Sequence, residues 1–214
     1  MQEKAEDSGR QRRDYLQLMR LERMADVIFA IILWRAIISF PTPTAKQFSW
    51  EQIGPFLSAN QGDFTMVLIG ILVVIVFWLQ NNLLFGNLHA TDTRHTILSI
   101  LQLFFLLIFT VSLRVGVEVE PSYITRAFES ITAGMVGVVS SWGWSYAIKN
   151  RRLLSPEVTD TYALELKDRI LAEPLTALIT LPFAFVSASL WEISWLSYLP
   201  VAFLLRRRRR AKMK

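Results

Sequence analysis

The chain has 214 residues, of which 52% are hydrophobic and only 19% are charged, and its mean hydropathy is +0.34. This composition excludes intrinsic disorder, a disulfide scaffold and a secreted soluble enzyme, because the charged residues are also separated by long uncharged runs. The runs cover positions 64–91, 95–113, 130–148 and 174–191. Uncharged segments of about 18 residues or more are typical of membrane-spanning helices, so the sequence predicts an all-α integral membrane protein.

The predicted elements divide the chain into three parts. Residues 1–24 are too polar for the apolar core of a signal peptide, and we expect a helix from about Asp14. Residues 25–205 form a predicted membrane domain, and residues 206–214 form a basic tail. The six predicted spans cover residues 25–41, 65–86, 96–114, 128–148, 171–187 and 189–205. Because the last two spans are short and contain Pro182 and Pro200, a hairpin or a partly re-entrant pair is an alternative there.

The positions of the positive charges predict the orientation of these spans. Nineteen of the 23 lysines and arginines lie in the N-terminal segment, in the loops after the second and fourth spans, and in the tail. Cytoplasmic loops are enriched in Lys and Arg, so both termini are expected in the cytoplasm, with the spans in the plasma membrane. The same distribution explains the net charge of +5 without a nucleic-acid partner. The run Arg206–Arg210 is expected to contact anionic lipids of the inner leaflet.

The connection between the fourth and fifth spans contains a helix start signal. Ser155 is a plausible N-cap, and Pro156 suits the first helical position. The sequence therefore predicts a cytoplasmic helix over residues 156–172, polar on one face and leading into the fifth span.

The first span contains two charged residues, and such residues are candidates for function because they are costly in a membrane. Asp26 lies about two residues inside the boundary, where Arg23 is the better local partner and Arg20 is available to a neighbouring helix. An interfacial charge cluster that sets the depth of the helix is the alternative. Arg35 lies further in, where it either extends outward to water or requires an internal anion.

Two patterns indicate helix faces. At 100° per residue, one face of the first span carries Val27, Ile31, Trp34 and Ile38, with Arg35 at its edge. Taken alone, this face is typical of helix packing. The fourth span carries small residues at every fourth position, which predict close packing within the subunit or between subunits. These residues are Ala133, Gly137, Ser141 and Ser145.

No pattern indicates an enzyme. The chain has no cysteine, and its two histidines are His89 and His95, so thiol chemistry and a histidine-rich metal site are excluded. It has no glycine-rich phosphate loop, which excludes an ATP-driven pump, and no nucleophile elbow. We therefore expect no catalytic residues, resident metal or cofactor.

The segment Arg20-Leu-Glu-Arg-Met24-Ala25-Asp26 at the beginning of the first span resembles the first-helix motif of the prokaryotic potassium channels related to transmembrane protein 175. The first helix of that family carries the motif Arg-x-x-x-Phe-Ser-Asp. Here Arg20 and Asp26 keep the register, while Met24 and Ala25 replace Phe and Ser. The chain is identified on this basis as a divergent member.

Two further regions carry the resemblance. Residues 78–85, followed by Asp92 and the apolar run 98–107, resemble the family's connection between its second and third helices. Residues 153–157 and the later Pro174-Leu175 resemble its cytoplasmic connection into the fifth helix. Together these regions cover most of positions 20–190.

The resemblance implies a passive, potassium-conducting channel with six helices per subunit and four subunits around the first helix. It implies that Ile31 forms an apolar constriction, with Trp34 and Ile38 further out, and that potassium is the permeant ion. It also implies a structural network that holds the first helix against the second and third. The residues of that network would be Arg20, Asp26, Trp78, Asn81 and Ser99.

The chain departs from the family at three of these positions. Asn81 stands where the family often has His, Ser99 where it often has Asn, and Trp34 where a smaller residue is usual. Arg35 beside a cation pathway would oppose potassium unless it is paired. Two other functions remain open: a secondary transporter with a buried Arg35 site, and a non-conducting membrane scaffold.

Overall fold

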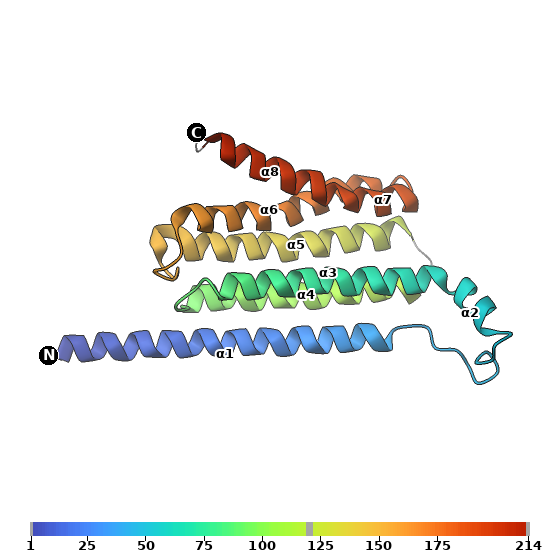
Figure 1. Cartoon of the computed structure of the whole chain (residues 1–214), viewed down its shortest axis with the longest axis horizontal. Helices are drawn as coiled ribbons and strands as arrows, with labels where there is room; N and C mark the ends of the chain where they lie inside the picture. Colours follow the sequence, from blue (N-terminus) through green and yellow to red (C-terminus); the bar gives the residue numbers. More distant parts are fainter. Residues whose placement is uncertain (1, 119–121, 213–214) are drawn as a thin grey trace.

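A computed structural model of the chain describes residues 2–118 and 122–212. It is built from helices that run side by side along one direction (Figure 1). The helices are α1 Gln2–Ile38, α2 Ile53–Ala59, α3 Gln61–Phe85, α4 Thr93–Glu118, α5 Tyr123–Ile148, α6 Asp160–Phe183, α7 Ala188–Ser194 and α8 Tyr198–Lys212. Short 3₁₀ turns cover Lys149–Arg151 and Trp195–Ser197. The predicted all-α fold class is confirmed.

The order of packing follows the chain. Helix α1 packs on α3 and α4, α4 packs on α5, α5 on α6, and α6 on α8. The start of α1 and the end of α8 lie at the same end of the bundle, together with the α3–α4 and α5–α6 connections (Figure 1). Helices α2 and α7 lie at the other end. The chain therefore has one end with both termini and one end with the α1–α3 loop.

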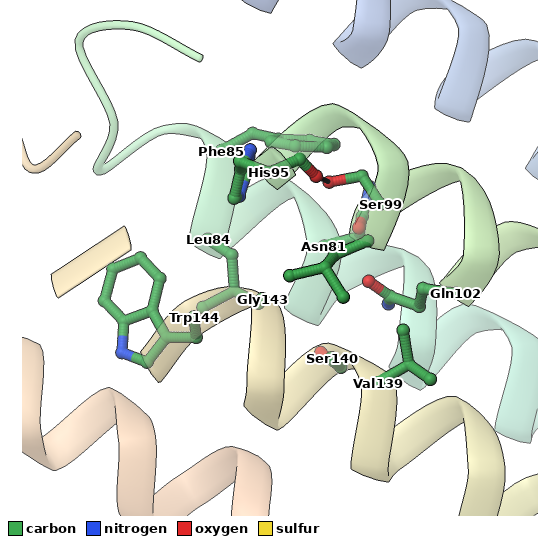
Figure 2. A pocket seen from close by; sticks show the side chains of 11 residues that line it. Asn81, Leu84, Phe85, His95, Ser99, Gln102, Val139, Ser140, Gly143 and Trp144 are labelled. Carbon is green, nitrogen blue, oxygen red and sulfur yellow. Dashed lines mark hydrogen bonds between the residues drawn. The ribbon is translucent and has the colours of Figure 1, made fainter. Parts of the chain in front are cut away.

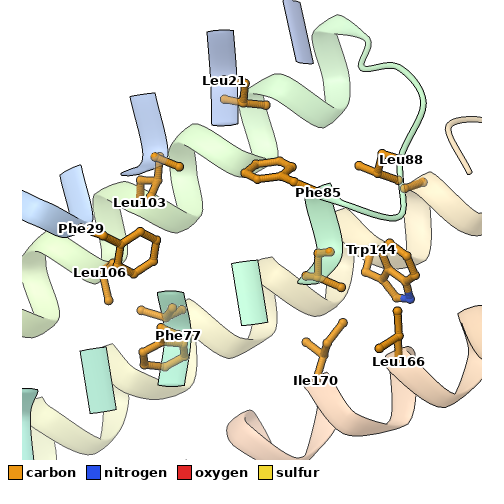
Figure 3. Packing of buried hydrophobic residues seen from close by; sticks show 14 of the residues in the cluster. Leu21, Phe29, Phe77, Phe85, Leu88, Leu103, Leu106, Trp144, Leu166 and Ile170 are labelled. Atoms are coloured by element: carbon orange, nitrogen blue, oxygen red, sulfur yellow. The ribbon is translucent and has the colours of Figure 1, made fainter. Parts of the chain in front are cut away.

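A continuous apolar core joins α1, α3, α4, α5 and α6 (Figure 3). The rings of Phe77 on α3 and Phe109 on α4 meet edge to face, with centroids 6.3 Å apart. Trp144 on α5 is buried, and its indole N–H donates a hydrogen bond to the Ala163 carbonyl on α6 at 2.9 Å. Because lipid is as apolar as these side chains, tight packing and such buried hydrogen bonds hold the helices together.

The small residues of α5 form the contact with α6. A Cβ added at Gly137 would lie 2.6 Å from Cδ of Pro174, and one added at Gly134 would lie 3.2 Å from Cβ of Ala177. The backbones therefore approach more closely here than larger side chains would allow. Of the two packing arrangements that the sequence left open for this stripe, the structure shows the one within the subunit.

The start of α6 differs from the prediction. The helix begins at Asp160, and the hydroxyl of Thr159, not Ser155, accepts the capping hydrogen bond from the Tyr162 N–H at 3.3 Å. The cause is Arg151, whose guanidinium binds the Asp160 carboxylate and the carbonyls of residues 155, 156 and 158. These bonds hold the segment as a turn, so Pro156 is not the first helical residue.

Helix α1 is longer than predicted, because it begins at Gln2 and not near Asp14. The preceding residues include good helix formers such as Glu, Lys, Ala, Arg and Gln, and no proline occurs before Pro41. With 37 residues, α1 extends about 55 Å at 1.5 Å per residue, which exceeds the hydrocarbon thickness of about 30 Å. Its N-terminal part accordingly projects beyond α3 and α4 (Figure 1).

Three segments of the described chain are long and apolar enough to cross a membrane. They cover Gln61–Phe85, Thr93–Gly116 and Ala188–Arg209. The last of these includes α7, a short 3₁₀ turn and most of α8, so it is longer than the predicted span over 189–205. Helix α6 continues through Pro174 and Pro182 and ends at Phe183, which separates it from the final segment.

Candidate functional site

One face of α1 is not covered by the rest of the chain. Val27, Ile31, Trp34 and Ile38 expose between 51 and 64% of their surface. The opposite face of α1 is buried against the bundle through Ala25, Phe29 and Ile32. A contiguous apolar face of this kind requires lipid, another protein or a pore to cover it.

Asp26 anchors this helix to α3. The indole N–H of Trp78 donates a hydrogen bond to the Asp26 carboxylate at 3.0 Å. The bond joins two side chains that lie 52 positions apart in the chain. Together with the buried Ala25, Phe29 and Ile32, this bond fixes which face of α1 meets the bundle.

Arg20 and Arg23, the two arginines that the sequence suggested as partners of Asp26, do not pair with it in the described part of the chain. In residues 2–118 and 122–212, neither Arg20 nor Arg23 forms an ion pair with Asp26 within 4.0 Å. Arg20 instead borders a groove of about 350 Å³ between α1 and the first turns of α4. The other residues of this groove are Gln17, Leu21, Met24, Thr93, Thr96, Ile97 and Ile100.

Asn81 and Ser99 lie together in the interior, as Figure 2 shows. They line a cavity of about 10 Å³, the size that holds roughly one water molecule. Three more polar side chains line this cavity, namely His95, Gln102 and Ser140. The described side chains show no hydrogen bond from Asn81 or Ser99 to Asp26 or Trp78. The five expected network residues thus occupy separate places: an Asp26–Trp78 pair, the Asn81–Ser99 cavity, and Arg20 in the groove.

A hydrogen-bond network links α4, α5 and α1 at the end with both termini. The Asp92 carboxylate accepts from the His95 N–H at 2.8 Å and from the Tyr146 hydroxyl at 2.5 Å. Thr91 and the His95 ring form a hydrogen bond of 2.9 Å, and the Thr91 N–H donates to the Asp14 carbonyl at 3.4 Å. The network therefore positions α1 relative to α4 as well as capping α4.

Arg35 lies on the exposed side of α1, near its end. Its side chain is exposed in the single chain, so the subunit does not build a buried anion site around it. The secondary-transporter alternative, which required a buried Arg35, has no support from this arrangement.

Sequence reasoning missed the buried polar residues of α3, α5 and α6. The sequence interpretation used Gln80, Glu129 and Glu173 only as positions within or at the ends of apolar runs, and it assigned them no role. Glu129 is 3% exposed, and both carboxylate oxygens of Glu173 are buried. An acidic residue inside a predicted span was the signal that could have identified both glutamates.

Comparison with known proteins confirms the family resemblance. Residues 20–109 match the family described as endosomal/lysosomal potassium channel TMEM175. A search of curated proteins finds no match. The exposed α1 face, the Asp26–Trp78 pair, and Asn81 and Ser99 of the cavity fall within the matched region, whereas Ser140 on the α5 side of the cavity lies outside it.

Two solved structures share the fold over most of the chain. One is a homologue of the lysosomal potassium-selective channel TMEM175 from Chamaesiphon minutus, with 16% identity, a TM-score of 0.67, and coverage of 92% of this chain and 97% of that one. The other is a variant of the potassium channel MtTMEM175 in complex with a nanobody fusion protein. It has 17% identity, a TM-score of 0.61, and coverage of 90% and 93%.

Proposed function

From this relationship to the TMEM175 family, we propose that the protein is a passive cation channel that conducts potassium. The matched family is described as a potassium channel, and both similar structures are of potassium channels or their homologues. The observation that carries the proposal is the match of residues 20–109 to this channel family, because that region includes the exposed apolar face of α1.

The proposed pore is formed by α1 from four subunits around a central axis. Ile31 would form the constriction, with Val27 before it and Trp34 and Ile38 after it. All four side chains are exposed in the single chain and so are available to line a shared passage. Apolar constrictions gate by losing or gaining water, so conduction would depend on the hydration of this ring. The Asp26–Trp78 bond supports the proposal because it attaches α1 to α3 with the apolar face of α1 pointing away from the bundle.

The proposed topology has six spans, with both termini in the cytoplasm and the domain over residues 25–205 in the plasma membrane. The positive charges support this orientation, and the start of α1 and the end of α8 lie at one end of the bundle. The segment 1–24 and the tail 206–214 would then extend from the cytoplasmic face. The exposed arginines at positions 206–208 favour contact with anionic lipids there.

Ion flux from liposomes containing the purified protein tests the proposal. We expect potassium-driven flux that exceeds sodium-driven flux, with little chloride flux. Replacing Ile31 by Asn should raise conduction roughly tenfold or reduce selectivity, because a polar ring stays hydrated.

The matched control is Leu178→Ala on α6, which also alters an exposed apolar side chain but lies outside α1. Unchanged flux in Ile31→Asn would remove this residue from the pore. Chloride flux would indicate that Arg35, and not a cation pathway, determines which ion passes. The absence of flux under every gradient would favour the non-conducting scaffold.

A further inference from the structure

Helix α6 carries an acidic side chain into the interior of the bundle. Both carboxylate oxygens of Glu173 are buried, and within the described residues neither has a hydrogen-bond partner. A buried charge without a partner is strongly unfavourable, and a partner, a bound cation or a proton must compensate it.

One hydrogen-bond acceptor lies in the turn of α6 that precedes Glu173. Pro174 has no N–H, so the Ile170 carbonyl one turn earlier lacks its helical donor. Helical side chains lean toward the N-terminus, which places the Glu173 side chain over this same turn. The Ser141 hydroxyl oxygen is also buried without a partner.

Among the described residues, no donor forms a hydrogen bond with the Glu173 carboxyl group. Gln80 on α3 is close enough to influence Glu173, but its amide N–H donates to the Ser140 hydroxyl at 3.4 Å, and its geometry toward the carboxylate does not form a hydrogen bond. Arg169, one turn earlier on α6, is exposed, so solvent screens its charge. Tyr198 on α8 faces the same region, near Arg206.

The contact with α5 leaves little room for another group. A Cβ added at Gly137 would lie 3.3 Å from Cβ of Glu173 and 2.6 Å from Cδ of Pro174. The stem of Glu173 is therefore pressed against the α5 backbone, and the groups that α5 presents here, Ser140 and Ser141, are neutral. A proton needs no additional space, whereas a metal ion does.

We propose that Glu173 is a proton-binding site in the interior of each subunit, separate from the α1 face. The carboxylate takes up one proton from solvent and becomes a neutral acid that donates a hydrogen bond to the acceptors around it, while α5 and α6 stay packed. Release of the proton to solvent leaves a buried anion and loosens this contact. The site does not depend on the proposed ion conduction.

Thermal unfolding of the purified protein from about pH 5 to about pH 9 tests the site. The packed state holds one more proton than the unfolded state, so wild-type stability should fall as the pH rises. The expected decrease in the unfolding midpoint is roughly 3 °C per pH unit over the sensitive range. Glu173→Gln keeps the shape and remains neutral, so its midpoint should fall less steeply with pH than that of the wild type, while any contribution of the buried Glu129 stays the same in both.

The matched control is Glu192→Gln, which removes an exposed carboxylate and should keep the wild-type slope. If Glu173→Gln does not fold, Glu173→Met provides the same comparison with a neutral side chain of similar size. Identical pH slopes in wild type and the Glu173 variants would overturn the proposal.

Two further measurements test the same site. Infrared spectra at neutral pH should show a C=O band of a protonated carboxylic acid that is weaker in Glu173→Gln than in the wild type, and equal bands in the two proteins would overturn the proposal. Stabilisation by potassium or sodium that is lost in Glu173→Gln would assign the site to a metal ion instead. All of these readouts remain valid if the protein shows no ion flux.

Discussion

Helix α1 and the α5–α6 pair are held in the molecule in different ways. Helices α5 and α6 meet backbone to backbone at Gly137 and are joined by buried hydrogen bonds, including Trp144 to the Ala163 carbonyl and Ser130 to Thr180 at 2.9 Å each. Helix α1 has one apolar face on the bundle and one face exposed, and a single side-chain hydrogen bond, from Trp78 to Asp26, is described between it and the other helices.

This difference suggests that α5 and α6 form a structural frame and that α1 carries the function. A close backbone contact with buried hydrogen bonds permits few alternative arrangements, so α5 and α6 are suited to a fixed frame. A helix with few polar attachments and an uncovered apolar face is suited to an interface or a pore that changes its hydration. Changes in the two regions should therefore affect different properties, stability for α5–α6 and conduction for α1.

The largest expected effect is on the α5–α6 contact. Gly137→Ala places a Cβ 2.6 Å from Pro174 Cδ, so the helices must separate. Overpacking of this kind costs about 1–3 kcal/mol. We expect a lower unfolding midpoint in detergent. The control is Gly143→Ala, whose Cβ would meet Leu98 at an ordinary 3.8 Å. Equal midpoints for the two variants would show that the contact is not the rigid part of the molecule.

An intermediate effect is expected at the attachment of α1. Trp78→Phe removes the indole N–H and leaves the Asp26 carboxylate without this donor, at a cost of about 1 kcal/mol. Hydrogen exchange should increase in α1 while α5 stays protected, and potassium flux should change. Trp142→Phe, at an exposed tryptophan on α5, is the control. Faster exchange in α5 and α1 alike would mean that the two regions are not independent.

The smallest effect is expected from Arg35. Removing this exposed charge by Arg35→Gln should leave the unfolding midpoint unchanged and raise potassium flux by roughly two- to threefold at low salt, since the charge opposes cations near the proposed pore. The gain should disappear at high salt because of screening. Arg208→Gln on α8 removes a comparable exposed charge away from α1 and should have no effect. A similar gain in potassium flux in both variants would show that the effect comes from the net charge of the protein and not from the position of Arg35.

Several features were predictable because they depend on local sequence. The uncharged runs located α3, α4 and α5 to within a few residues, and the small residues of α5 indicated a packing face. The start of α6 was not predictable in the same way. Ser155 and Pro156 satisfy the local rules for a helix start, but Arg151 binds the carbonyls of that turn and moves the start to Asp160. A local start signal does not include a contact that Arg151 makes from the preceding 3₁₀ turn.

By itself, the sequence determined the approximate positions of α3, α4 and α5, which face of α1 is apolar, and which end of the molecule is basic, because helical period and charge are properties of neighbouring residues. Only the tertiary structure decided which polar groups meet. Asp26 finds Trp78 across 52 positions of the chain, and Asn81 shares a cavity with Ser99. The Glu173 carboxylate oxygens are buried where α5 packs closely against α6 at Gly137. The burial of a polar atom depends on how helices cross, and no local pattern encodes that geometry.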